Sequence, residues 1–141
     1  MKKLFLISVI LIGFTMCDNP AGKSSGTGKT IVSIFYFHGT NRCGNCMAIE
    51  ENTQKALDTF FPVEVKDGLV KFISVNIDSA ANKSLVEKCE ASAMTLFVIK
   101  TDSDGKETKS DHTEFALNTA RSKPDAYMQG IRDRIVELMK N

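Results

Sequence analysis

The chain has 141 residues and carries 18 lysines and arginines against 17 aspartates and glutamates, a formal net charge of +1. Proteins that bind nucleic acid usually carry a marked basic excess, so this balance gives no reason to expect a nucleic-acid partner. The length suits one modest domain. Four cysteines and two histidines are present, and the cysteines carry most of the information about function.

The amino terminus predicts export. Lys2 and Lys3 precede an almost entirely apolar run over residues 4–14, which is typical of a secretory signal peptide. The run is too short to cross a bilayer, which needs roughly 20 residues. A buried helix is the alternative, but the lysines and the polar loop that follows argue against it. We therefore expect residues 1–16 to be a signal peptide and the body to be exported, so that a disulfide can persist.

Cys17 closes this segment at the position that resembles the lipidated cysteine of bacterial lipoproteins, which becomes their mature amino terminus. Phe14, Thr15 and Met16 replace the residues usually found before that cysteine, so ordinary signal cleavage remains the second interpretation. We expect a membrane-anchored lipoprotein of the bacterial cell envelope that contacts the membrane only through its lipid. Without lipid on Cys17, the protein would be periplasmic or secreted.

Residues 17–30 predict a flexible, lipid-anchored tether, because Gly, Ser, Thr and Lys dominate and apolar residues are nearly absent. The end of this segment, residues 26–30, resembles the tail of a phosphate-binding loop. That motif requires glycine where this chain has Lys23, and it leaves a strand rather than preceding one. We assign no nucleotide-binding role to the segment.

Cys43 and Cys46 are the most informative pair in the chain. The apolar run over residues 31–37 predicts a buried strand, a short polar loop follows, and a helical pattern begins at the cysteines. A Cys-x-x-Cys between a strand and a helix is typical of a redox dithiol. At the start of a helix, free N–H groups and the helix dipole favour a Cys43 thiolate. Cys46 would then be close enough to resolve a mixed disulfide.

Other interpretations of the pair are weaker. A zinc site needs four ligands, and the remaining cysteines and histidines do not supply a second pair at a suitable spacing. A purely structural disulfide is the other alternative, and it would leave the strand–loop–helix setting unexplained.

Hydrophobic periodicity predicts alternating strands and helices beyond the dithiol, which implies an α/β sheet covered by helices. Pro62 ends the first helix, and Pro124 suits the first turn of the last one. Cys89 falls on an apolar helical side and is expected to be buried and inert, with a third redox role as the alternative. The predicted elements are strands over residues 69–77, 95–99 and 107–112 and helices over residues 82–90, 114–120 and from 124 onward.

Over roughly residues 31–139 the chain resembles proteins of the thioredoxin-like superfamily. Four features carry the resemblance: the strand before the dithiol, the Cys-x-x-Cys that opens a long helix, the run Val75-Asn76-Ile77-Asp78, and the run Met94-Thr95-Leu96-Phe97-Val98. The resemblance implies an α/β fold with a thioredoxin-like mixed sheet of about four strands flanked by helices, over residues 31–141. It also implies exchange with protein thiols or disulfides, in which Cys43 attacks and Cys46 resolves.

More narrowly, the chain is similar to a small bacterial group called ArsF-type, described as a nitrophenyl-compound nitroreductase subunit. That similarity implies a reductase partner in the membrane or envelope. The sequence shows no flavin or nicotinamide motif, so we expect no bound cofactor and no nitroreductase activity from the chain alone. The similar residues are Phe37-His38-Gly39, Arg42-Cys43, Cys46, Ile49-Glu50, Asn76-Ile77-Asp78, Asn82-Lys83 and Leu85.

The chain departs from the thioredoxin pattern at the residue before Thr95. The family normally holds a cis-proline there, and this chain has Met94. A cis bond before a residue other than proline costs roughly 2.5–4 kcal/mol, so we expect the Ala93–Met94 bond to be trans or strained. Loss of the proline weakens the case for a general disulfide reductase. It also leaves room for a soft metal or cluster on the sulfur atoms of Cys43, Cys46 and Met94.

Two further residues have open supporting roles. The family's buried acid is missing, because Tyr36 and Phe37 occupy the matching strand positions. His38 could carry protons near Cys46 instead, or it could simply hydrogen-bond the loop. Arg42 precedes the dithiol, where a guanidinium would lower the pKa of the first thiol and attract an anionic partner, unless it is a solvated loop residue.

Two classes of function therefore remain. The leading hypothesis is an envelope thiol–disulfide oxidoreductase with a Cys-Gly-Asn-Cys dithiol, in which Cys43 and Cys46 are catalytic. The alternative is a non-enzymatic accessory or soft-metal-binding module, a reductase subunit on the same fold. Met94 and the missing buried acid favour that alternative.

Overall fold

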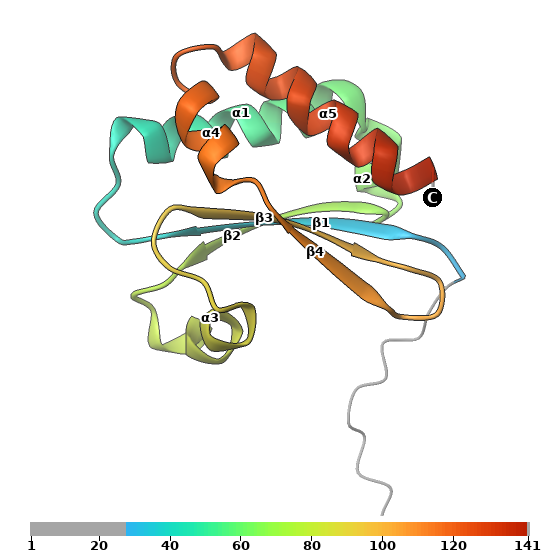
Figure 1. Cartoon of the computed structure of the whole chain (residues 1–141), viewed down its shortest axis with the longest axis horizontal. Helices are drawn as coiled ribbons and strands as arrows, with labels where there is room; N and C mark the ends of the chain where they lie inside the picture. Colours follow the sequence, from blue (N-terminus) through green and yellow to red (C-terminus); the bar gives the residue numbers. More distant parts are fainter. Residues whose placement is uncertain (1–27, 141) are drawn as a thin grey trace, which may run out of the picture.

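A central sheet with helices on both faces makes up the described part of the chain, residues 28–140 of a computed structural model (Figure 1). The expected signal peptide, Cys17 and most of the expected tether lie outside the described residues. Within residues 28–140, no helix has the length and apolar character needed to cross a bilayer. The elements are β1 (Ile31–His38), α1 (Gly44–Phe60), α2 (Pro62–Lys66), β2 (Val70–Asn76), the 3-10 helix η1 (Ala80–Asn82), α3 (Lys83–Cys89), β3 (Thr95–Thr101), β4 (Glu107–Asp111), α4 (Thr113–Thr119) and α5 (Pro124–Lys140).

The four strands form one mixed sheet in the order β2-β1-β3-β4. β1 runs parallel to β2 and antiparallel to β3, and β4 pairs antiparallel with β3. Phe37, near the end of β1, pairs with Val75 of β2 and with Thr95 of β3. The carboxyl ends of β1 and β2 therefore meet the start of β3 at one end of the sheet, and α1 begins just beyond that end.

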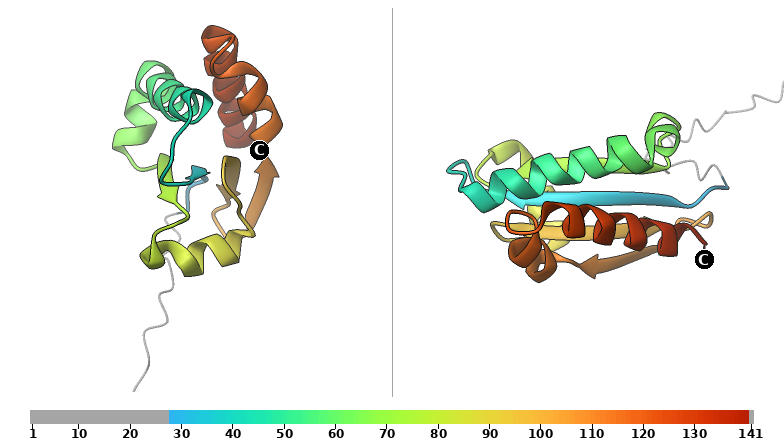
Figure 2. Two further views of the ribbon diagram at one scale, coloured as in Figure 1. Left: turned by 90° about the vertical axis from the view of Figure 1, so that its left-hand side faces the viewer. Right: turned by 90° about the horizontal axis from the view of Figure 1, so that it is seen from above.

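The helices cover the two faces of the sheet unequally. The four helices α1, α2, α4 and α5 lie on one face, whereas α3 lies on the other (Figure 1). Figure 2 shows α1 and α5 running side by side above the sheet. This is the α/β arrangement that the sequence predicts, a mixed four-stranded sheet flanked by helices.

Alternation along β1 sorts its side chains into two cores, because successive residues of a strand point to opposite faces. Ile34 and Tyr36 lie in the larger core, beneath α1 and α5, together with Cys46. Phe35 and Phe37 lie in the smaller core beside α3. Tyr36 and Cys46 are thus brought into the same layer of the molecule.

The predicted elements lie within a few residues of the observed ones. Two short elements were not predicted, α2 and η1. Pro62 ends α1 as expected, but it is also the first residue of α2, because proline lacks only an N–H that the first turn leaves free. Five residues are too few to produce a recognisable hydrophobic periodicity, which is why the sequence did not indicate α2.

Candidate functional site

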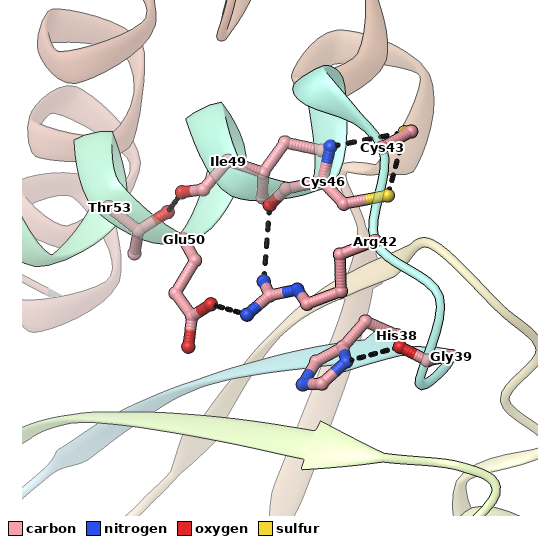
Figure 3. A network of polar contacts seen from close by, with 8 residues as sticks. All are labelled: His38, Gly39, Arg42, Cys43, Cys46, Ile49, Glu50 and Thr53. Atoms are coloured by element: carbon pink, nitrogen blue, oxygen red, sulfur yellow. Dashed lines mark hydrogen bonds and ion pairs between the residues drawn. The ribbon is translucent and has the colours of Figure 1, made fainter.

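Cys43 is the residue that begins α1. Its backbone is extended, with φ of −90° and ψ of 169°, and its sulfur accepts a hydrogen bond from the backbone N–H of Cys46 at 3.4 Å (Figure 3). Side chains at this position satisfy one of the free N–H groups of the first turn. Cys43 is exposed. The local sequence therefore places a thiol at the positive end of a helix and in contact with solvent.

The two cysteines have different surroundings. Their sulfur atoms lie 2.8 Å apart as free thiols, but Cys46 is only 4% exposed and belongs to the larger core. The neighbouring Cys46 thiol and the backbone N–H groups of the first turn hold the pKa of Cys43 below its ordinary value. An exposed thiol that ionises readily, with a buried thiol directly behind it, can attack an external disulfide and then be released by its partner.

The loop before the dithiol is tied to the sheet. The backbone N–H of Thr40 donates to Oδ2 of Asp78 at 2.7 Å, and the Asn76 side chain donates to the Thr40 hydroxyl at 3.1 Å. The bond from Thr40 also lowers the pKa of the Asp78 carboxyl. These contacts join the end of β1 to the segment after β2 and fix the direction in which the chain reaches Cys43.

Arg42 is engaged with α1. Its guanidinium forms an ion pair with Glu50 and donates to the Cys46 carbonyl at 3.3 Å (Figure 3). It also lies 5.9 Å from the centre of the Tyr36 ring. The main contributions that lower the Cys43 pKa come from Cys46 and from backbone groups, and Arg42 is not among them. Arg42 is therefore neither a solvated loop residue nor a direct neighbour of the Cys43 sulfur.

His38 points toward the loop. Its Nδ1 lies 2.9 Å from the Gly39 carbonyl oxygen (Figure 3). Its ring packs 5.6 Å from the centre of the Tyr36 ring. The structure thus shows the loop hydrogen bond that was one of the two interpretations of this residue. His38 is only 9% exposed, so it lies largely buried beneath the loop that leads to the dithiol.

Met94 and Thr95 lie opposite the dithiol, where the thioredoxin resemblance places its cis-proline. The Met94 Sδ atom is 3.8 Å from the Cys43 sulfur. All peptide bonds in the described residues are trans, and Met94 has a φ of 57°, so the backbone is left-handed at a residue with a side chain. Thr95 is buried and donates to the Ser92 carbonyl at 2.9 Å, which fixes the start of β3.

Two further side chains reach the site, one at a position that the thioredoxin resemblance had marked and one that sequence reasoning did not place there. The Tyr36 side chain is fully buried beside Cys46 and Arg42, and its hydroxyl has no hydrogen-bond partner among the described residues. Arg121, between α4 and α5, lies against Gly44 of the dithiol loop, since a methyl group on Gly44 would be 3.0 Å from its Nη1. Tyr36 was expected only as one of the two strand positions where the buried acid is missing, whereas nothing local marks Arg121, so only the fold reveals that residue.

The other potential ligands lie elsewhere. Cys89 is buried in the smaller core, on the opposite face of the sheet from Cys46. Within the described residues, no group of three or more His, Cys, Asp or Glu side chains is arranged to hold a metal ion. The contacts bring three sulfur atoms together at the site, those of Cys43, Cys46 and Met94.

No protein-family model matches the sequence, and no curated protein does either. Among solved structures, the chain is similar to oxidized mitochondrial thioredoxin 3 from Saccharomyces cerevisiae, with a TM-score of 0.42 and 22% identity, over 72% of this chain and 77% of that one. It is also similar to a malarial protein, with a TM-score of 0.40 and 17% identity, over 65% of this chain and 98% of that one. These similarities concern the fold, and neither assigns an activity to this chain.

Proposed function

We propose that the chain is a thiol–disulfide oxidoreductase of the bacterial cell envelope that exchanges its dithiol with protein thiols and disulfides. One observation carries the proposal. The exposed Cys43 thiol, with its lowered pKa, stands at the start of α1 with the buried Cys46 sulfur 2.8 Å behind it. A structural cysteine pair would need neither the exposure nor the lowered pKa.

In the reductive direction, the Cys43 thiolate attacks one sulfur of a substrate disulfide, and the other substrate sulfur leaves as a thiolate and takes up a proton. The Cys46 thiolate then attacks the Cys43 sulfur of the mixed disulfide. The bond between Cys43 and the substrate breaks, the second substrate thiolate takes up a proton, and Cys43 and Cys46 become a disulfide. The substrate disulfide gains two electrons and the protein dithiol loses two.

Insulin reduction by the reduced protein tests the proposal. We expect Cys43→Ser to abolish turnover and Cys46→Ser to accumulate a mixed disulfide with the substrate, because the second step is blocked. Cys89→Ser is the matched control, since Cys89 is a buried thiol on the other face of the sheet. Equal activity in the wild type and the Cys43→Ser variant would show that the proposal is wrong.

A second candidate is a non-enzymatic accessory module that holds a soft metal or docks on a reductase partner. The observation that favours it is the Met94 sulfur, 3.8 Å from the Cys43 sulfur, because thiolate and thioether sulfur suit ions such as Cu(I). The reductase partner is the role implied by the narrower similarity to ArsF-type subunits.

Met94→Leu separates the two candidates, because leucine has nearly the same volume and lacks the sulfur. For an oxidoreductase we expect insulin reduction by this variant to stay within about threefold of the wild type. A metal-binding module would retain copper after anaerobic reconstitution and lose it in the variant. Met47→Leu is the control, because Met47 is a methionine exposed on α1.

A further inference from the structure

Tyr36 holds a buried hydroxyl that the fold leaves without a partner. The side chain lies in the middle of β1 and is fully buried, and its oxygen has no hydrogen-bond partner among the described residues. Buried polar groups are nearly always hydrogen-bonded, so each exception needs an explanation. The other fully buried tyrosine, Tyr127, meets this rule, because its hydroxyl lies 2.6 Å from the Thr53 hydroxyl.

The surroundings of the Tyr36 hydroxyl point to Cys46. Cys46 and Arg42 are the titratable groups that act on it directly, and both belong to the dithiol segment. Across the sheet, Tyr36 pairs with Ser74 of β2 and Leu96 of β3, neither of which carries a charge.

Two further polar side chains lie beside the ring and are bonded to other groups, although the Nε of Arg42 has no hydrogen-bond partner among the described residues. Arg42 lies over the Tyr36 ring and is held there by its ion pair with Glu50 and by its bond to the Cys46 carbonyl. The His38 ring, 5.6 Å away, donates to the Gly39 carbonyl. Tyr36 is fully buried and Cys46 is only 4% exposed, so the hydroxyl and the Cys46 sulfur both lie on the buried side of the dithiol.

We propose that Tyr36 is a positioning residue for the resolving step, whose hydroxyl donates a hydrogen bond to the Cys46 sulfur when that sulfur is a thiolate. The inference rests on the proposed disulfide exchange and names a residue that acts through Cys46. A thiol or disulfide sulfur is a weak acceptor, whereas a hydrogen bond to an ionised acceptor is about twice as strong as one between neutral groups. The hydroxyl therefore makes its strong hydrogen bond only during the resolving step, when the Cys46 sulfur is a thiolate.

The proton balance of the step is simple. In the mixed disulfide, Cys46 gives its proton to solvent, while the phenol keeps its own proton and donates it as a hydrogen bond. Burial and the neighbouring Cys46 raise the pKa of Tyr36, so the phenol stays protonated throughout the range in which thiols ionise. The Cys46 thiolate then attacks the Cys43 sulfur, and the substrate sulfur leaves as a thiolate and is protonated by water.

Tyr36→Phe tests this role, because it keeps the ring in the core and removes only the hydroxyl. The reduced protein is mixed with a peptide disulfide, and the mixed disulfide on Cys43 is followed over time by acid quenching at a series of pH values. We expect its decay to be about tenfold slower near neutral pH, with the pH of half-maximal rate raised by about one unit. The initial attack by Cys43 should change by less than about twofold, because Cys43 is exposed whereas the phenol is fully buried.

A labelling experiment that needs no exchange separates this inference from the proposed function. In a Cys43→Ser background, the rate at which iodoacetamide labels Cys46 is measured against pH with and without Tyr36→Phe. We expect the hydroxyl-free protein to reach half-maximal labelling about one pH unit higher. Tyr127→Phe is the matched control, because it removes another buried hydroxyl of the same core, one that hydrogen-bonds to Thr53. The pH profile of Cys46 labelling should not change in this variant.

The outcomes are distinct. If the labelling and decay profiles of Tyr36→Phe match those of the wild type, the role assigned to Tyr36 is wrong. If the labelling profile moves but the wild type forms no mixed disulfide with any peptide disulfide, the proposed exchange fails while the contact between Tyr36 and Cys46 stands.

Discussion

The chemistry of Cys43 depends on a single neighbouring side chain more than on the charge before it. The Cys46 thiol makes the largest contribution to the lowered Cys43 pKa, followed by the backbone N–H groups at the start of α1. The Arg42 guanidinium is instead paired with Glu50. A hydrogen-bond donor at position 46 should therefore lower the pKa of Cys43 more than Arg42 does.

We expect Cys46→Ala to move the iodoacetamide labelling of Cys43 to higher pH, because alanine removes the donor that stabilises the thiolate. Cys46→Ser keeps a donor in the same place and should leave the profile closer to that of the wild type. Peptide mapping after labelling at a series of pH values measures both. Faster labelling of Cys46 than of Cys43 in the wild type at neutral pH would contradict the assignment of the attacking thiol.

Glu50 offers a test of the contact that holds Arg42. Partial burial acts to raise the pKa of Glu50, but hydrogen bonds from Ser74 and Arg42 outweigh it and lower that pKa. A carboxyl whose pKa is lower in the folded protein stabilises the fold above its ordinary pKa, and that contribution disappears as the pH falls through the folded value. Glu50→Gln should therefore lower stability near neutral pH and matter little in acid.

We expect the free energy of unfolding of Glu50→Gln to fall by about 1 kcal/mol near neutral pH, and by much less near about pH 3. Urea unfolding at the two pH values measures the difference. Glu51→Gln is the control, because Glu51 is exposed on the same helix. A loss of stability that is the same at both pH values would show that the carboxylate is not responsible.

At the scale of elements, a close fit between two residues sets the contact of α4 with α5. Gly130 of α5 lies so near the Phe115 ring of α4 that a methyl group on the glycine would overlap the ring. The Phe115 ring also stacks on Tyr127, with ring centres 5.5 Å apart. The absence of a side chain at position 130 therefore sets how closely the two helices approach.

We expect Gly130→Ala to lower the free energy of unfolding by about 1–3 kcal/mol, although alanine is the better helix former by up to about 1 kcal/mol. Urea unfolding provides the measurement. The double variant Gly130→Ala/Phe115→Ala removes the overlap, so in a double-mutant cycle the two changes should not add. Additive effects would mean that the contact between Gly130 and Phe115 does not limit the approach of the helices.

The elements themselves could be predicted from sequence because each is long enough to show its own period. The strand before the dithiol, the helix that Cys43 begins and the amphipathic helix after Pro124 all carry a local signal. The position of the dithiol followed from the same local pattern. α2 and η1 have too few residues to show a period, and they were missed.

The rest of the site is formed by contacts between residues that are distant in the sequence, so no local pattern predicts them. Arg42 was predicted either to act on the neighbouring thiol or to be a solvated loop residue, but it forms an ion pair with Glu50, further along α1. Arg121 reaches the dithiol loop from the connection between α4 and α5. The sequence marks Tyr36 only as one of the two positions where the buried acid is missing, and the structure adds that its hydroxyl is unpaired beside Cys46.

At the scale of the whole molecule, β1 separates the dithiol from the amino-terminal segment. Ile31 begins the strand and pairs with Thr101, whereas His38 ends it and pairs with Asn76. The eight residues of β1 span about 26 Å, since a strand rises about 3.3 Å per residue. Cys43 follows the far end of the strand, so a tether joined at Ile31 would attach at the opposite end of the sheet from the dithiol.

Cys17, outside the described residues, is predicted to carry a lipid, and the geometry of β1 adds an expectation about which way the dithiol would then face. In detergent partitioning we expect the native protein in the detergent phase and Cys17→Ser in the aqueous phase, because the short apolar signal is removed and no other anchor is expected.

We also expect Cys43 of the membrane-bound protein to react with a soluble, membrane-impermeant thiol reagent within about twofold of the rate in detergent, since the dithiol would face away from the bilayer. Equal aqueous partitioning of both proteins would favour simple secretion. Strong protection of Cys43 on the membrane would show instead that the dithiol faces the lipid or a membrane partner.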